Sequence, residues 1–481
     1  MKSLDLNEDN LQLPQELIDD IIDILSAQES WQAVARCLLV ARSFVVRARR
    51  HLFSKISTRE YVFPSPGRGD SEKIDRLLEI LQEDPLRDSH PLALYVRSLR
   101  VSMFPASDTR CGPVTRKPEE WNAQRQNLRY VLEKLPNLHT FGLEFTTLMD
   151  WNSIQTGMYA GIIKVAESSQ LTTLQLTNIY HFCPEHVLAR CVNLRDLRLD
   201  NIWNVAPSAF SAIRFGSGAD PIRKHHDHPK WHPKSLRNLQ HIETKCAGDV
   251  FVGIMLAKRD KLLVSPLSQM RSFTLTVSPD QTVPEWEAMK CAASSLKRLA
   301  VFGLVSSDTT STFPGPIRLS VFTSLHTLVL SIDVAFRVSP NNLAFTLRSI
   351  SEPTTIENVT VNFKARYYFG LDTEDEFYSV YSSTTWPTID NALTGPSFSS
   401  LEKVHFDFKW QYYENKFSVD GDDDDQQGSS STSAEESVRE RCKRSQEQKD
   451  EILVRLSRRT EAVLPKLARS HRIECTYNNQ S

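Results

Sequence analysis

The sequence of 481 residues lacks several features that would place it in a familiar class. It has no run of about 18 apolar residues, which argues against a typical membrane-spanning helix. Its first ten residues show neither the basic start nor the apolar stretch of a signal peptide. Its eight cysteines form no Cys-x-x-Cys pair, so free thiols in a reducing compartment are expected rather than a disulfide framework. We therefore expect an intracellular protein of the cytoplasm, the nucleus or both.

A large charge imbalance and the common catalytic motifs are also missing. The net charge is -2 with 24% charged residues, so we expect neither a nucleic-acid nor a membrane partner. No Gly-x-Gly-x-x-Gly, Walker loop or Gly-x-Ser-x-Gly motif is present. Cys183 and Cys191 lack a local nucleophile signature and are more typical of small core residues. The sequence therefore predicts no catalytic residue, no cofactor and no enzymatic activity of its own.

One polar stretch, RKHHDHPKWHPKS at residues 223–235, is rich in histidine. Imidazole nitrogens suit zinc or copper, and the possible ligands are His225, His226, Asp227, His228 and His232. The stretch has no flanking cysteine and no helical spacing, so a solvated loop is the simpler interpretation. We predict no metal site there.

Arginines cluster at positions 42, 47, 49 and 50, where they could contact nucleic acid. They fall on a predicted helix whose other face is apolar, and acidic residues precede them in the chain. Without a matching fold, such a basic cluster is weak evidence for nucleic-acid binding. Neutralisation by the neighbouring acids is the preferred interpretation.

What the sequence does contain begins with LPQELIDDIIDIL at residues 13–25. Pro14 can occupy the first helical position, and the acids that follow favour the positive end of a helix dipole. Apolar residues recur at spacings of three and four, which predicts an amphipathic helix. Further short helices are predicted in WQAVARCLLV (31–40) and RSFVVRARRHLF (42–53), and Ser26 with Glu29 could form a capping box that starts the second helix.

Charge separates the two ends of this helical segment. Residues 1–30 carry eight acids and one lysine, whereas residues 31–59 carry seven basic residues and no acid. The first and third helices should therefore attract each other. Because three short helices are too few to fold well alone, the segment either docks on a partner or caps the domain that follows.

LPQELIDDIIDIL, followed by CLLVARSF (37–44) and RARRHLF (47–53), resembles the F-box in its fungal form. The resemblance covers about residues 11–56 and departs at Leu38 and Ala41, where the family often has Ser and Cys. F-box proteins bind a Skp-type adaptor, and through it the cullin and RING subunits of a ubiquitin ligase. The resemblance implies these adaptor contacts: Leu13, Pro14, Leu17, Ile18, Ile21, Leu25, Leu39 and Val40. Periodicity alone leaves open which of them face the partner and which face the module's own core.

The rest of the chain repeats a pattern, L-x-x-h-x-h, in which h is apolar. Its copies begin at Val96, Leu138, Leu171, Leu194, Leu239, Met270, Leu296, Leu325, Ile356 and Leu401. The last three positions predict a short strand, and helix-like stretches such as TGMYAGIIKVAESS (156–169) and NLAFTLRSISE (342–352) fill the spaces. A strand and a helix every 20 to 30 residues or so indicates a leucine-rich-repeat-like solenoid. The Asn of regular repeats falls one place early, at Asn178 and Asn201, and a run of βα units in an ordinary α/β sheet is the alternative.

The predicted fold is therefore mixed α/β, with a three-helix F-box followed by an irregular leucine-rich-repeat-like solenoid. Leu77, Leu78, Ile80 and Leu81 predict a connecting helix between the two. The expected parts are the helical module (1–56), linker and connecting helix (57–95), repeats (96–419), acidic disordered insertion (420–437), and C-terminal helix with the capping strand RIECTY (438–481).

Two functions from different classes fit these features. The first is a non-catalytic substrate receptor of a Skp–cullin–F-box ubiquitin ligase, which acts by holding its substrate near activated ubiquitin. The protein substrate, which the sequence does not identify, would contact outward strand residues, with Glu144, Arg198, Asp200, Phe302 and His405 as candidates. The second is a repeat scaffold that acts outside a ubiquitin ligase.

Overall fold

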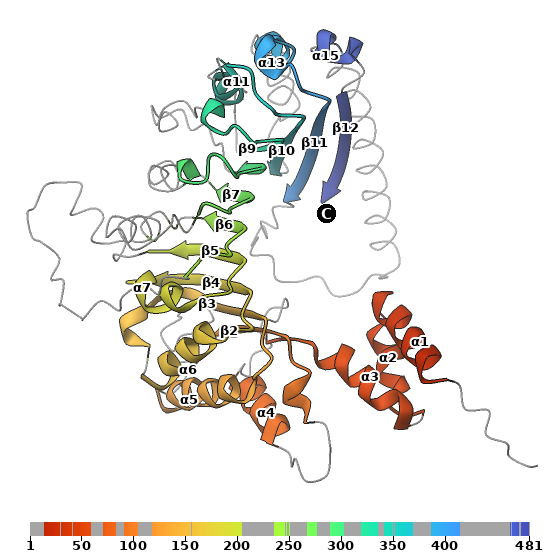
Figure 1. Cartoon of the computed structure of the whole chain (residues 1–481), viewed down its shortest axis with the longest axis vertical. Coiled ribbons are helices and arrows are strands. Elements are labelled where there is room, and N and C mark those ends of the chain that lie inside the picture. The colour runs from red at the N-terminus through yellow and green to blue at the C-terminus, as the bar shows by residue number, and fades with distance from the viewer. Residues whose placement is uncertain are drawn as a thin grey trace, which may run out of the picture. The chain divides into compact units, whose positions relative to one another are not determined.

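The structure is a computed structural model of the whole chain (Figure 1). It divides into two compact units, one of Met1–Leu239 with Asp249–Pro266 and one of Gln240–Gly248 with Leu267–Ser481. The structure describes residues 14–28, 30–40, 42–58, 71–82, 91–103, 118–154, 156–203, 235–245, 247, 250, 267–276, 289–302, 319–334, 341–348, 350, 352–368, 386–413, 462, 464–470 and 473–480.

The first unit begins with three short helices, α1 (Gln15–Ala27), α2 (Trp31–Cys37) and α3 (Arg42–Phe53) (Figure 1). Each helix contacts the other two, as the opposite charges of α1 and α3 predict. The expected capping box is wrong, because Ser26 lies inside the last turn of α1. The second helix starts after Ser30 instead, whose side chain makes no capping hydrogen bond.

A parallel sheet follows in the same unit, with each strand paired to the next along the chain. Its strands are β1 (Lys55–Ser57), β2 (Ser98–Met103), β3 (Thr140–Asp150), β4 (Thr173–Tyr180) and β5 (Asp196–Ile202). The helices of this part are α4 (Ser71–Gln82), α5 (Pro118–Lys134), α6 (Thr156–Glu167) and α7 (Pro184–Val187). Helix α5 packs against both α4 and α6, and the three lie together beside the strands (Figure 1). The connecting helix predicted around Leu77 is thus confirmed as α4.

The second unit contains a parallel sheet of the same kind, again with neighbours in chain order. Its strands are β6 (His241–Lys245), β7 (Ser272–Thr276), β8 (Arg298–Phe302), β9 (Thr327–Val334), β10 (Asn358–Tyr368), β11 (Lys403–Tyr413) and β12 (Ile473–Gln480). Its helices are α11 (Asn341–Arg348), α13 (Trp386–Leu393) and α15 (Pro465–Arg469). Fully buried Trp386 packs its ring 5.6 Å from that of Phe363 and 6.2 Å from that of Phe406, which fixes α13 on the sheet.

The repeated sequence pattern accounts for the strands. In all ten copies the first, fourth and sixth residues are buried, as Leu138, Phe141 and Leu143 illustrate. The first residue precedes the strand and packs beneath it, and the strand itself begins at the third position. Stacking parallel units buries these side chains continuously, which a single unit could not do.

Among the described residues, the strands of each unit follow one another in chain order, β1 to β5 in the first unit and β6 to β12 in the second. The predicted mixed α/β class is confirmed, as are the ten repeat strands and the final strand, β12. Strand β1 was not predicted. Residues 223–234 of the His-rich stretch, the acidic insertion at 420–437 and most of the predicted C-terminal helix lie outside the described residues.

Two asparagines form a short ladder at the ends of neighbouring strands. Asn178 and Asn201 have φ values of 61° and 56°, in the left-handed region that Asn tolerates better than most residues. Asn178 Nδ2 donates to Phe145 O at 2.5 Å, and Asn201 Nδ2 donates to Asn178 Oδ1 at 2.7 Å. Trp203 Nε1 extends the chain by donating to Asn201 Oδ1 at 2.6 Å. The one-residue offset of these asparagines from the regular repeat therefore does not prevent an asparagine ladder.

A buried carboxylate holds the last short helix in place. Asp390 on α13 is 2% exposed, and its two oxygens accept from Lys466 N and Leu467 N, each at 3.0 Å. Helix α15 follows Leu464, which has no side-chain oxygen with which to cap it. Asp390 supplies that cap from another helix, and a negative charge at this end also suits the helix dipole.

Candidate functional site

The helical module has a compact core of its own. Ile18 and Ile22 of α1 are buried with Val34 and Cys37 of α2 and Ala48 of α3. Around this core pack the partly buried side chains of Leu25, Leu38, Phe44 and Leu52. One side of α1 is therefore used to hold the three helices together.

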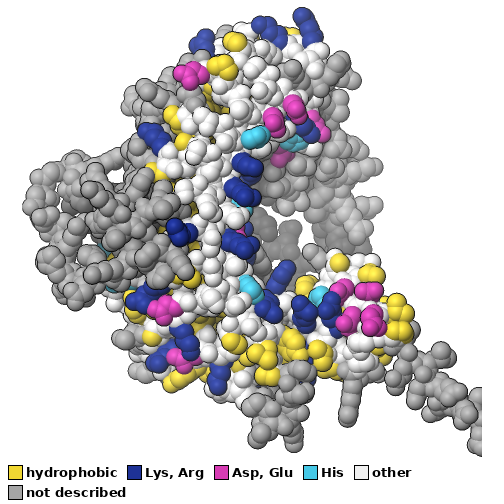
Figure 2. All heavy atoms as spheres, in the orientation of Figure 1, with side chains coloured by type: hydrophobic (Ala, Val, Ile, Leu, Met, Phe, Trp, Pro, Cys, Tyr) yellow, Lys and Arg dark blue, Asp and Glu magenta, His cyan; other side chains and the backbone are white. Residues whose placement is uncertain are grey.

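Outside this core, the module leaves large apolar side chains in solvent. On α1, Leu17, Ile21 and Ile24 are 49%, 42% and 58% exposed, and their spacing of four and three places them on one face. In the turn after α2, Leu39 and Val40 are 86% and 67% exposed. Figure 2 shows hydrophobic side chains beside acidic ones over this module. We call Leu17, Ile21, Ile24, Leu39 and Val40 the apolar face.

The eight predicted adaptor contacts thus fall into separate groups. Leu17, Ile21, Leu39 and Val40 belong to the apolar face, and Pro14 is exposed at the start of α1. Ile18 is buried in the module core, and Leu25 packs against that core. Leu13 lies outside the described residues.

Sequence reasoning left Ile24 and Trp31 out of the predicted contacts, although both are exposed. Ile24 follows Ile21 by three residues, so the same helical spacing could have identified it. Trp31 starts the second helix and carries no periodic signal of its own.

Asp23 fastens α1 to α3 beside the module core. Its carboxylate accepts from Arg47 Nε at 2.7 Å and from Arg47 Nη2, and it contacts His51 Nε2 at 2.7 Å. The pKa of Asp23 is lowered from 3.8 to about 2, chiefly by the hydrogen bond from Arg47. Burial opposes this shift, and the His51 hydrogen bond and the two neighbouring charges add to it. This clamp fixes the orientation of α1 and hence of the apolar face that it carries.

The five predicted substrate contacts all lie at outward positions of strands. In the first unit, Glu144 on β3 and Asp200 on β5 are aligned through Thr177, and Arg198 is two residues before Asp200. In the second unit, Phe302 is half-buried on β8. His405 on β11 is held by neighbours, with Nδ1 3.2 Å from Glu474 Oε2 and Nε2 2.6 Å from Thr476 Oγ1. The structure therefore groups Glu144, Arg198 and Asp200 on one sheet face.

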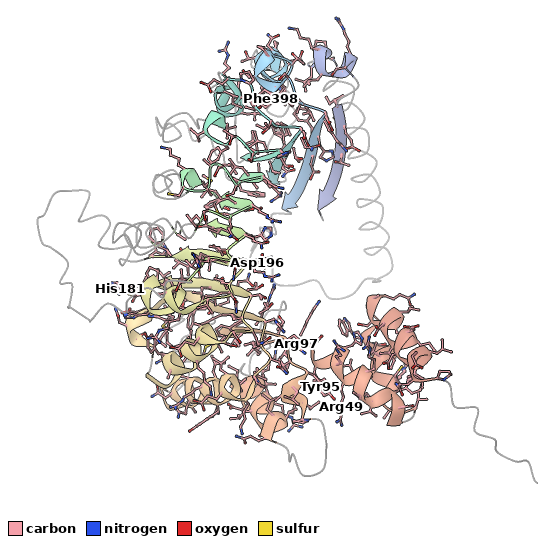
Figure 3. The ribbon with its side chains drawn as sticks, viewed as in Figure 1. Arg49, Tyr95, Arg97, His181, Asp196 and Phe398 are labelled. Carbon is pink, nitrogen blue, oxygen red and sulfur yellow. The ribbon has the colours of Figure 1, made fainter. Side chains whose placement is uncertain are left out.

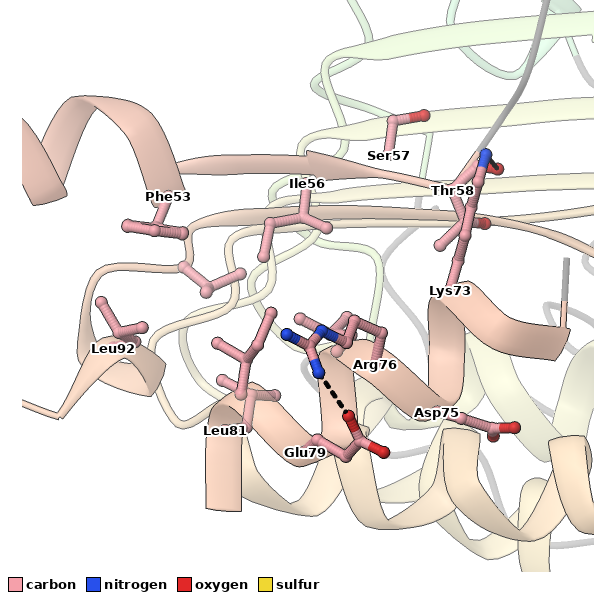
Figure 4. A pocket seen from close by; sticks show the side chains of 13 residues that line it. Phe53, Ile56, Ser57, Thr58, Lys73, Asp75, Arg76, Glu79, Leu81 and Leu92 are labelled. Carbon is pink, nitrogen blue, oxygen red and sulfur yellow. Dashed lines mark hydrogen bonds and ion pairs between the residues drawn. The ribbon is translucent and has the colours of Figure 1, made fainter. Parts of the chain in front are cut away.

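A pocket of about 870 Å³ lies between α4, β1 and the end of α3 (Figure 4). Its walls are largely apolar and include Phe53, Ile56 and Leu92. Its polar groups already pair with one another: Arg76 Nη1 donates to Glu79 Oε2 at 2.9 Å, and Lys73 Nζ donates to a backbone oxygen. Such a pocket suits an apolar group better than a charged one.

Among the described cysteines, Cys37 and Cys191 are buried, and Cys183, Cys291 and Cys475 are partly exposed. Burial raises the pKa of the Cys191 thiol to about 12, so it stays protonated at neutral pH. Among the described residues, no group of three or more His, Cys, Asp or Glu side chains is arranged to hold a metal ion. The histidines of the 223–235 stretch lie outside the described residues. Within the same described part, no helix is both long and apolar enough to cross a membrane.

Comparison with known proteins adds no relative to these observations. No protein-family model matches the chain, and no curated protein is significantly similar to it.

Proposed function

We propose that this chain is the substrate-recognition subunit of a Skp–cullin–F-box ubiquitin ligase. The helical module would bind the Skp-type adaptor, and through it the cullin and RING subunits, while the strand face would bind a protein substrate. The observation that carries the proposal is the apolar face of a module that already has its own buried core. Such a receptor would have no catalytic residue and would work in the cytoplasm or the nucleus.

A partner protein that covers the apolar face would remove its exposed aliphatic side chains from water. Five aliphatic side chains of α1 and of the turn after α2 are between 42% and 86% exposed, and exposed apolar patches often mark sites of protein–protein contact. Burying one aliphatic side chain fully stabilises a complex by about 1.5 to 3 kcal/mol. A groove between partner helices is the usual receptor for side chains spaced by three and four along a helix. This arrangement supports adaptor binding through α1 and the turn after α2.

The parallel sheet supports the second half of the proposal. An ordinary doubly wound α/β sheet reorders its strands, whereas these follow one another strictly in chain order. Chain order, together with the recurrent buried pattern, favours a leucine-rich-repeat-like solenoid. Most of its outward strand positions are polar or charged, as in Glu144, Gln175 and Arg198, and Phe302 is an aromatic exception. A face of this kind suits a protein surface.

The test is the affinity of the full chain for a purified Skp-type adaptor. Replacing Leu17 and Ile21 together with Asp should lower that affinity by more than about a hundredfold, because two aliphatic contacts are lost. Leu94→Asp is the matched control, since Leu94 is 41% exposed but lies outside the helical module. Both variants should keep the wild-type content of secondary structure.

The alternative, a repeat scaffold outside a ubiquitin ligase, makes the opposite prediction. In that case the folded wild-type chain would not bind the adaptor. Equal binding by the wild type and by the Leu17 and Ile21 double variant would also contradict the proposal, because it would move the contact away from the apolar face.

A further inference from the structure

Three cations gather where β1 and β2 begin. Lys55 is paired with Ser98 in the parallel register, and Arg100 is two residues farther along β2. Neighbouring strands lie about 4.8 Å apart and residues advance about 3.3 Å, so the Lys55 and Arg100 Cα atoms are roughly 8 Å apart. Arg97 precedes β2 and donates from Nη1 to His139 Nε2 at 2.9 Å. Figure 3 labels Arg97, and Figure 2 shows Lys and Arg side chains over this part of the sheet.

No acidic partner of these cations is found in the part of the chain that the structure describes. All three side chains are exposed, and no carboxylate among the described residues forms an ion pair with Lys55, Arg97 or Arg100. Four other arginines of the first unit, Arg47, Arg76, Arg129 and Arg190, are each paired with an acid. The β1–β2 cations therefore keep their full charge available to a ligand.

A small notch in the sheet face lies next to Arg100. The register aligns Arg100, Gly142 and Gln175 across three strands, and the middle residue has no side chain. A Cβ atom at Gly142 would lie 3.1 Å from Arg100 Cγ and 3.5 Å from Gln175 Oε1. The resulting space of about 30 Å³ is also lined by Glu144 and Thr177. It can take a water molecule or the end of one small polar side chain.

The groups around the notch can hold one end of an anionic side chain. Arg100 offers a fork of N–H donors and Gln175 an amide NH₂, which match carboxylate oxygens. Glu144 borders the notch two residues beyond Gly142 along β3, so negative charge is favoured only toward Arg100 and Lys55. A ligand with separate single charges fits this surface better than a continuous polyanion does.

We propose that the outward face of β1–β4 binds an extended acidic segment of a partner protein, with one Asp or Glu carboxylate at the Gly142 notch. Alternate side chains of an extended segment lie about 6.6 Å apart on the same side, close to the Lys55–Arg100 spacing. Nucleic acid is disfavoured, because it carries a charge at every residue, whereas a peptide can place a neutral side chain beside Glu144. This inference rests on the proposed function only in identifying that partner as the ligase substrate.

The test is fluorescence anisotropy with the full chain and a labelled peptide of about eight residues, alternating Asp and Ser, long enough to cross four strands. We expect saturable binding that weakens as salt is added, and no binding of the matched peptide with Asn in place of Asp. Arg100→Glu should lower the affinity by about tenfold or more, because it reverses a charge that contacts the carboxylate. Arg237→Glu, at an exposed arginine outside the strands of the same unit, should leave the affinity unchanged.

Gly142→Ala tests the notch itself without changing any charge. The added methyl group would meet the Arg100 stem at 3.1 Å, so the affinity for the Asp peptide should fall while the salt dependence remains. Equal binding of the Asp and Asn peptides would overturn the inference, as would equal effects of Arg100→Glu and Arg237→Glu. Tighter binding of a phosphoserine peptide or of single-stranded DNA of matched length would assign the surface to a different ligand and also overturn it.

The outcome is independent of adaptor binding. The Leu17→Asp and Ile21→Asp double variant should bind the Asp peptide as the wild type does. Failure of the wild-type chain to bind the adaptor, with intact peptide binding, would overturn the proposed ligase function alone. The reverse result would overturn only the acidic-segment inference.

Discussion

Removing the Asp390 carboxylate should release the C-terminal helix and strand from the second unit. Asp390→Ala leaves Lys466 N and Leu467 N without their acceptors, and Leu467 is fully buried. A hydrogen bond to a charged group contributes about 1.5 to 3 kcal/mol, and part of that gain is offset by the cost of burying the carboxylate. We therefore expect Asp390→Ala to lower the free energy of opening α15 and β12 by about 2 to 4 kcal/mol.

Hydrogen exchange measured by mass spectrometry on the full chain would report this local opening. Protection of residues 464–480 should fall by about thirtyfold to a thousandfold, since 1.4 kcal/mol corresponds to a factor of ten. Peptides from β3 to β5 should exchange at the wild-type rate. Asn391→Ala is the matched control: Asn391 is exposed and accepts only from the side chain of Lys466, so its loss should change protection little.

Two results would refute this reasoning. Unchanged exchange at 464–480 in Asp390→Ala would show that the carboxylate does not cap α15. Equal loss of protection in Asn391→Ala would show that any change at this end of α13 releases the helix. Asp390→Asn separates the two roles of the carboxylate, because one oxygen remains as an acceptor while the NH₂ group faces a backbone donor. It should lie between the wild type and Asp390→Ala.

Two further predictions concern the first unit. The pKa of Asp23 is lowered to about 2 in the folded chain, so its stabilising contribution is complete above about pH 4 and is lost as the pH falls toward 2. Because the Asp23 side chain is 41% exposed, the loss of stability should be about 1 kcal/mol or less. The protection of α1 amides from hydrogen exchange, corrected for intrinsic rates, should fall less between pH 5 and 3 in Asp23→Asn than in the wild type. An equal fall in protection in the two proteins would contradict a stabilising role of the Asp23 carboxylate. Asn201→Ala should destabilise the chain by about 1 to 3 kcal/mol in urea unfolding, because it loses side-chain hydrogen bonds and places Ala at φ 56°. Asn201→Gly keeps the backbone relaxed and should cost less; equal losses would refute the backbone argument.

The strands were predictable because their determinants are local. In each L-x-x-h-x-h copy, the apolar positions are two or three residues apart, and burial follows that spacing in all ten copies. The pattern predicts where a strand lies and which side chains point inward. It does not contain β1, because Lys55–Ser57 is only three residues long and pairs through its backbone with β2. Strand β1 also spans the expected boundary between the helical module and the linker.

The faces of α1 could not be separated from the sequence. Its apolar residues form one wide stripe, so Ile18 and Ile22 carry the same signal as Leu17 and Ile21. Only packing against α2 and α3 shows that the first pair is buried and the second exposed. The Ser26 capping box failed for a related reason: the apolar contacts of α1 extend the helix through that residue.

The remaining features depend on residues far apart in the chain. Asp390 caps a helix 76 residues later, and no local pattern links the two. The notch at Gly142 requires the alignment of β2, β3 and β4, which periodicity does not specify. Arg100 occupies an outward position of a recognised repeat, so its exposure was predictable, but its position beside a glycine on the next strand was not.

The central claim is that the apolar face of the helical module binds a Skp-type adaptor. Hydrogen exchange of the full chain, measured with and without a saturating amount of purified adaptor, tests it most directly. We predict a complex in which the amides of residues 15–40 gain protection from exchange, while the strands from β2 to β5 exchange as in the free chain. Failure of the folded chain to form a complex, or protection that appears on the strands and not on residues 15–40, would contradict it.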